Sequence, residues 1–256
     1  MIKYFLGGFL RLDLCYALAI ADIKQFFHRA VLGILWVTLS FFLFIIVKNF
    51  IFSSFVTVPE EVFVMWVALG YAIWVFISTS VVEGSILFVR ARPWILSLRI
   101  PCSVFVMQSL IKLSIFMLFN LVACFIIALV FKFQLQAHAL YALPGFLALF
   151  INHILLQTTI GYFAAKHRDI IHFLQAAMRI MFFLTPILYM PGQIGKKAAF
   201  LQYNPFTHFL AIIRDPIIFG TIPVLSWIVV GGITLVSLCV SMLVVKYSMK
   251  NLSLWV

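Results

Sequence analysis

Six long apolar runs without charge clusters divide this chain, and charged or turn-forming segments separate them. They cover about residues 31–52, 62–82, 104–131, 139–165, 170–190 and 222–245. A helix crosses the hydrocarbon core of a bilayer with about 20 predominantly apolar residues. The runs lack the apolar–polar alternation of transmembrane barrel strands. The pattern therefore predicts an all-α integral membrane protein whose residues 31–256 form one domain of six transmembrane helices.

Residues 1–30 have a different pattern, because charged residues interrupt every apolar stretch. Tyr4, Phe5, Phe9 and Leu12 fall on one side of a helix drawn through this segment. Such a sequence is typical of an amphipathic helix that lies in the membrane interface. A disordered leader is the alternative.

The segment between the last two runs carries several helix breakers, among them Pro191, Gly195 and Pro216. They surround two apolar pieces, 198–201 and 206–213, which are too short to span a membrane. We expect short re-entrant helices that close the outer end of a transport path, with a break at Asn204 and Pro205. An ordinary surface loop is the alternative.

Composition and charge agree with a membrane protein, since 65% of the residues are hydrophobic while the net charge is +11. Of the 18 basic residues, 11 lie in alternate connections: Lys3, Arg11, Lys24, Arg29, Arg90, Arg92, Arg99, Lys166, Arg168, Lys246 and Lys250. The positive-inside rule places these connections and both termini in the cytoplasm. The connection before the last run breaks the rule with Lys196, Lys197 and Arg214.

No motif for catalysis, metal binding or nucleotide binding is recognisable. The seven acidic residues are scattered, and the histidines lack a metal-ligand spacing. Gly192, Gly195 and Lys196 do not have the spacing of a phosphate-binding loop. We therefore expect no catalytic residue, no metal, no cofactor bound by this chain and no nucleic-acid partner.

Two charges inside the apolar runs, Lys112 and Arg179, are costly in a bilayer unless they face a cavity or find a partner. Arg179 either contacts an anionic or polar substrate, or it pairs structurally with Glu83 or a backbone carbonyl or snorkels to the interface. The sequence leaves the pairing partners of Arg179 and Lys112 open. The tryptophans near the ends of the runs are typical of interfacial anchors: Trp66, Trp74, Trp94 and Trp227. Some aromatic residues could instead line a sugar path.

The order of these features resembles the type-2 ABC exporter permeases, specifically the branch that exports O-antigen, capsule and teichoic acid. The matching landmarks span nearly the whole chain: Asp22 to Arg29, Leu32 to Trp36, Arg90 to Arg92, Arg99 to Pro101, Arg168 to Ile170, Thr185 to Ile187, and Asn204-Pro205 followed by Arg214.

The resemblance implies a multi-pass permease of the bacterial cytoplasmic (inner) membrane that takes part in lipopolysaccharide biosynthesis. It implies a homodimer with two nucleotide-binding ATPase subunits, which bind ATP and Mg, and a lipid-pyrophosphate-linked glycan as substrate in a lipid-embedded channel. By position, it assigns the ATPase contact to Asp22, Lys24, Arg29, Lys166, Arg168 and Asp169. It assigns the substrate entrance to Arg90, Arg92 and Arg99. Arg179, Tyr189, Phe200 and Tyr203 are candidates for the channel or its outer gate.

The arginine cluster suits a pyrophosphate chemically, because guanidinium groups form bidentate bonds to phosphate oxygens. Positive-inside topology alone is the other explanation for these residues. Two alternative functions remain: a type-2 ABC exporter of drugs or lipids, and a membrane-embedded transferase. The transferase would need clustered carboxylates or histidines at one membrane face.

Overall fold

The computed structural model describes residues 7–52, 58–97, 100–134, 137–248 and 252. Every regular element in this part of the chain is a helix, which confirms the all-α expectation. The elements are α2 (Leu12–Phe26), α3 (Leu35–Phe52), α4 (Glu60–Arg90), α5 (Arg92–Ser97), α6 (Ser103–Val130), η2 (Ala137–Ala142), α7 (Leu143–Lys166), α8 (Asp169–Leu184), η3 (Pro191–Tyr203), α9 (Pro205–Phe219) and α10 (Val224–Ser248). The predictions for Tyr4, Phe5 and Arg99 fall outside the described residues.

Four helical stretches within the described residues are long and apolar enough to cross a membrane: 60–90, 103–130, 137–166 and 224–247. The apolar helix at residues 35–51 is shorter. The chain is therefore a membrane protein by length and composition of its helices.

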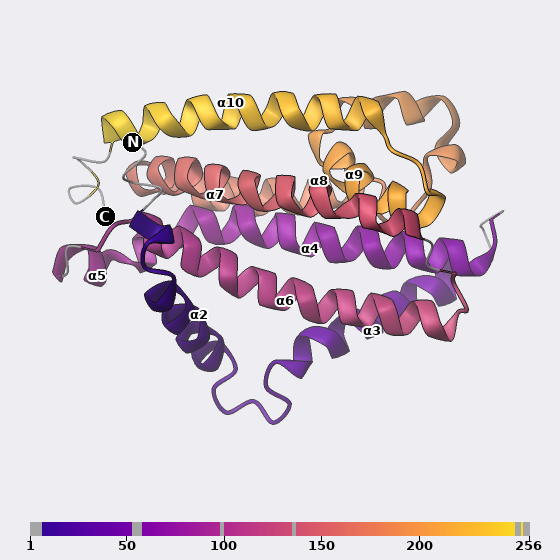
Figure 1. The fold of residues 1–256 in the computed structure, drawn as a ribbon, viewed down its shortest axis with the longest axis horizontal. Coiled ribbons are helices and arrows are strands. Elements are labelled where there is room, and N and C mark those ends of the chain that lie inside the picture. The colour runs from indigo at the N-terminus through magenta and orange to yellow at the C-terminus, as the bar shows by residue number, and fades with distance from the viewer. Residues whose placement is uncertain (1–6, 53–57, 98–99, 135–136, 249–251, 253–256) are drawn as a thin grey trace.

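The long helices lie side by side and run between two ends of the molecule (Figure 1). We call these the α5 end, where α4 stops and α6 starts, and the α9 end, which holds η2, η3 and α9. α4 is the central helix, since it packs against α6, α7, α8 and α9. α2 packs against α6 on the α5 half of the bundle, while α3 rises toward the α9 end.

The contact between α4 and α7 depends on two glycines that let the helices approach closely. A Cβ atom on Gly161 would lie 2.8 Å from the ring of Phe88, and one on Gly84 would lie 3.0 Å from Gln157. Membrane helices pack through small residues of this kind, because lipid supplies no hydrophobic force between them. The two glycines thus hold α7 against the central helix.

Helix ends differ from the predicted spans at two places that matter for the site. α4 does not stop near Val82 but continues to Arg90, because residues 86–89 are again apolar after Glu83. α8 stops at Leu184, short of the predicted 190, where Thr185 has an extended backbone with φ −97° and ψ 137°. Pro186 accounts for this, because the ring of a proline disfavours helical geometry in the residue before it.

The segment before α10 contains two short helices. Asn204 separates η3 from α9, with an extended backbone and a side chain that accepts a hydrogen bond from the Phe206 amide at 3.0 Å. This is an ordinary N-cap, and Pro205 takes the first helical position, where no amide donor is needed. α9 is packed into the bundle from His208 to Arg214.

Candidate functional site

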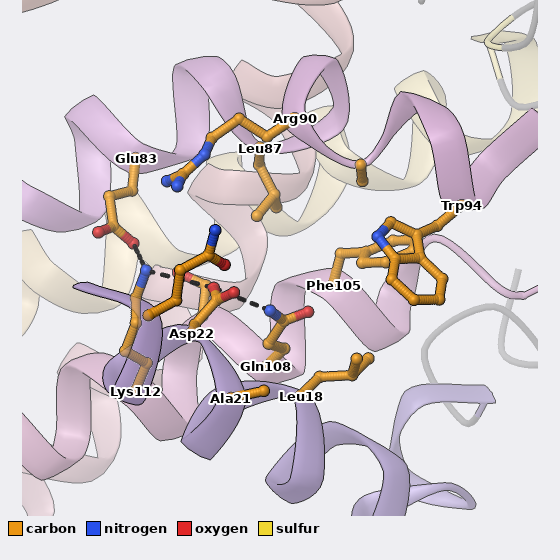
Figure 2. Close-up of a pocket in the computed structure, with 13 residues that line it drawn as sticks. Leu18, Ala21, Asp22, Glu83, Leu87, Arg90, Trp94, Phe105, Gln108 and Lys112 are labelled. Carbon is orange, nitrogen blue, oxygen red and sulfur yellow. Dashed lines mark hydrogen bonds and ion pairs between the residues drawn. The ribbon is translucent and has the colours of Figure 1, made fainter. Parts of the chain in front are cut away.

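A cavity of about 400 Å³ opens at the α5 end between α2, α4, α5 and α6. Figure 2 shows its lining, in which four charged side chains, from Asp22, Glu83, Arg90 and Lys112, face one another among apolar neighbours. Helical spacing brings them there. Glu83, Leu87 and Arg90 share a face of α4, and Gln108 and Lys112 share a face of α6, since residues three or four apart are neighbours on a helix.

Lys112 is the centre of this cluster. Its Nζ atom lies 2.8 Å from Oε2 of Glu83 and 3.7 Å from Oδ2 of Asp22. The same carboxylate oxygen of Asp22 accepts a hydrogen bond from Nε2 of Gln108 at 2.9 Å. The residue as a whole is 7% exposed. Lys112 is therefore paired structurally, and it takes the Glu83 partner that the sequence suggested for Arg179.

Arg90 extends over the cavity toward Glu83 (Figure 2), and it forms no ion pair within the described part of the chain. Two carboxylates and two cations line the cavity, so their formal charges cancel. A free anion would meet Asp22 and Glu83 there as well as the basic groups. Arg92 lies outside this cavity, exposed at the start of α5.

The residues expected at an ATPase contact separate into two groups. Asp22 is turned into the cavity and is paired, as described above. The other five are exposed on the surface: Lys24, Arg29, Lys166, Arg168 and Asp169. The last three form the junction between α7 and α8 at the α5 end.

The candidates for the channel and outer gate lie in two grooves. Tyr189, Phe200 and Tyr203 line one groove of about 670 Å³ at the α9 end, where Phe200 and Tyr203 are 79% and 85% exposed. Arg179 lies elsewhere, in an open groove of about 810 Å³ between α3, α4 and α8. That groove is rich in aromatic side chains, including Phe44 and Tyr71, whose ring centroids are 3.7 Å apart.

Sequence reasoning missed the role of Arg214 and misjudged two tryptophans. Arg214 is buried in α9 and its Cζ atom lies 3.2 Å from the ring centroid of Trp66. Trp66 and Trp74 are each 4% exposed, so neither is an interfacial anchor, because both pack inside the bundle. The available signal was the position of Arg214 directly after the apolar piece 206–213, since a charge in apolar surroundings needs a partner.

Comparison with known proteins gives two curated relatives from Klebsiella pneumoniae, both named O-antigen export system permease protein RfbA. One is 23% identical over 226 residues, and the match covers 86% of this chain and 85% of the relative. The other is 22% identical over 219 residues, with 84% and 83% covered. No family model matches the chain.

Proposed function

We infer that this chain, as a type-2 ABC exporter permease of the polysaccharide branch, moves a lipid-linked polysaccharide across the cytoplasmic membrane. The observation that carries this function is the similarity to two permeases named for O-antigen export, over 86% and 84% of the chain. A glycan has many hydroxyl groups and little apolar surface, so it needs a protein-lined route across hydrocarbon.

The relatives also weigh against the alternative functions. Both are named as permeases, which favours transport over group transfer, and both are named for O-antigen, which favours polysaccharide over drugs or lipids. The pyrophosphate-linked lipid carrier remains part of this proposal.

We propose six membrane crossings rather than four, because of how the chain runs. α7 finishes at the α5 end and α10 starts at the α9 end, so the chain between them must return across the bundle. α8 makes this return, and its 16 residues are about 24 Å long. α3 likewise connects α2 to the start of α4 at the α9 end.

In this proposal the α5 end faces the cytoplasm, and so do both termini. Five basic residues support this orientation at the α5 end: Arg90, Arg92, Lys166, Arg168 and Lys246. At the α9 end, Arg214 is buried beside Asp215, so its charge does not oppose the positive-inside rule. η3 and α9 then form the re-entrant outer closure.

We propose a homodimer of this chain with two ATPase subunits, which bind ATP and Mg at the cytoplasmic side. The chain has no phosphate-binding loop, so hydrolysis requires a partner. Lys24, Arg29, Lys166, Arg168 and Asp169 are exposed and suit a contact with that partner. Arg90 and Arg92 are proposed to receive the anionic head group, while Arg179 and the groove of Tyr189, Phe200 and Tyr203 belong to the channel and its outer gate.

Deletion of the gene in its own host tests the function. We expect surface polysaccharide to disappear and the lipid-linked glycan to accumulate inside the cell, and a plasmid copy of the gene should reverse both effects. A matched control supplies the same plasmid to cells whose partner ATPase lacks its phosphate-loop lysine, where export should stay absent. Unchanged surface polysaccharide in the deletion strain would contradict the proposal.

A further inference from the structure

α2 packs against the bundle through small buried side chains, partly buried leucines and the polar contacts of Asp22. Among its described side chains only Cys15, Ala19 and Ile23 are buried, whereas the larger Tyr16 and Phe26 are 58% and 74% exposed. The packing partner of this helix is α6. Leu14 and Leu18 are partly buried in the same contact, and the ring centroids of Phe26 and Phe27 lie 6.4 and 6.1 Å from that of Phe116 on α6. Asp22 adds polar contacts with Lys112 and Gln108 to this apolar docking of α2.

Those contacts lead to a lysine that also has a second carboxylate partner. Lys112 lies 2.8 Å from Glu83, on α4, and 3.7 Å from Asp22, on α2. A buried ion that loses its only partner is strongly destabilising, because its charge stays out of water without compensation. Lys112 keeps a partner when α2 moves, because Glu83 belongs to a different helix and is the nearer of the two carboxylates.

We propose that Lys112 positions α2 through its pair with Asp22, and that Glu83 keeps Lys112 neutralised when α2 leaves α6. α2 thus has two states. In the docked state Asp22 pairs with Lys112, and in the undocked state Glu83 alone pairs with Lys112, so no unpaired charge remains in the bundle interior. The inference rests on the proposed function for its use, since α2 corresponds to the interface helix through which an ATPase subunit would act. The docked and undocked states of α2 depend only on residues of this chain, whatever the exporter transports.

The arrangement predicts opposite effects for the two carboxylates. Asp22→Asn removes the charge that attracts α2 to Lys112, so α2 should undock more often. Glu83→Gln leaves Asp22 as the only carboxylate beside Lys112, so undocking would leave the ammonium group unpaired and α2 should stay docked. If both acids served only to stabilise the fold, both substitutions would loosen α2.

Cys15 reports the docked state without any added probe. Its side chain is fully buried against Val104 and Met107 of α6, and burial raises the pKa of its thiol, so the docked helix protects it from alkylation. The experiment uses the assembled exporter in membrane vesicles, with Cys102, Cys124 and Cys239 replaced by alanine. The rate of reaction of Cys15 with N-ethylmaleimide is measured, together with export by the same preparation.

We expect Asp22→Asn to raise the labelling rate about fivefold, the size of one partly exposed ion pair. Glu83→Gln should lower the rate and reduce export while the complex stays assembled. Glu61→Gln is the matched control, because this acid lies at the opposite end of α4, and it should change neither quantity. In a Lys112→Met background, Glu83→Gln should lose its effect on labelling, since the two residues act as a pair.

A Glu83→Gln variant that raises Cys15 labelling as Asp22→Asn does would overturn the inference. So would a Glu83→Gln effect of the same size with and without Lys112. Failure of the proposed function would give another result. The unsubstituted complex would export no glycan, while Asp22→Asn would still raise and Glu83→Gln would still lower the labelling rate of Cys15.

Discussion

A single guanidinium joins three segments of the α9 end. Nη1 of Arg214 donates a hydrogen bond to the Pro186 carbonyl at 2.8 Å, and the group stacks on Trp66 of α4. Nε of Arg214 lies 3.7 Å from Oδ1 of Asp215. A planar guanidinium can stack and donate at the same time, which an ammonium group cannot do as well. Arg214 thereby fixes α9 against α4 and against the bend after α8.

We predict that Arg214→Lys destabilises the protein although it keeps the charge. The loss of stacking in a desolvated site should lower the free energy of unfolding by about 2 kcal/mol. Thermal unfolding of the purified protein in detergent measures the effect. Arg179→Lys is the control, because Arg179 is exposed and its replacement should leave the unfolding temperature nearly unchanged. Equal stability of the two variants would show that the stacked geometry contributes little.

Arg90 and Arg92 are the arginines for which a substrate contact is testable. Each should add about 1 kcal/mol to the attraction of an anionic head group at the membrane surface, so we expect an Ala replacement to reduce initial export about fivefold. Lys replacements should reduce it less, since they keep the charge but lose the bidentate geometry. Export by inverted vesicles with limiting substrate is the measurement. Normal export by the assembled Ala variants would leave topology as the only role of these residues.

At the scale of elements, η3 and α9 differ in how much of their surface is buried in the bundle. α9 is buried from His208 to Arg214, whereas Phe200 and Tyr203 of η3 present large aromatic surfaces outward. In water such a pair would be unfavourable, so lipid or a second copy of the chain is the expected environment. The proposed re-entrant closure requires such an environment around η3.

We predict that cysteines at Phe200 and Tyr203 react slowly with a membrane-impermeant maleimide added from outside. Membrane depth or the dimer mouth should shield them, while a cysteine at Gln134, which is exposed at the α9 end, should react fast. A cysteine-free background is needed because Cys239 is exposed. Equal reaction rates at all three positions would identify η3 as an ordinary surface loop.

At the scale of the whole molecule, the distribution of charge between the two ends is the observation behind the proposed orientation. The basic residues of three connections gather at the α5 end, although those connections are far apart in sequence. The α9 end carries two acids, Glu60 and Glu61, at the start of α4, together with the basic residues Lys132, Lys196 and Lys197. This arrangement is typical of a cytoplasmic α5 end.

Two cysteines that flank α7 test this orientation. In intact cells, we expect a membrane-impermeant maleimide to label Gln134→Cys and to miss His167→Cys, because the two exposed positions lie on opposite sides of the membrane. Permeabilised cells are the control, in which both should react. Labelling of His167→Cys alone in intact cells would reverse the orientation. The cytoplasmic and outer roles proposed for the residues at the two ends would then be wrong.

The sequence by itself determined the features that depend on local composition. Apolar runs of sufficient length, such as 104–131, indicated the helices, and the breakers around Asn204 indicated the interruption before α10. Both follow from short-range physics, because chain length against bilayer thickness and the geometry of proline act within one segment.

Only the tertiary structure decided which side chains meet. Lys112 and Arg179 had the same standing in the sequence, yet Lys112 pairs with Glu83 and Asp22 while Arg179 stays exposed. Trp66 likewise packs on Arg214 instead of anchoring at the interface. The physical reason is the solvent: helices in a bilayer are apolar on their lipid-facing and core-facing sides alike, so periodicity does not reveal which face turns inward. The neighbour of each polar group is fixed only when the helices pack.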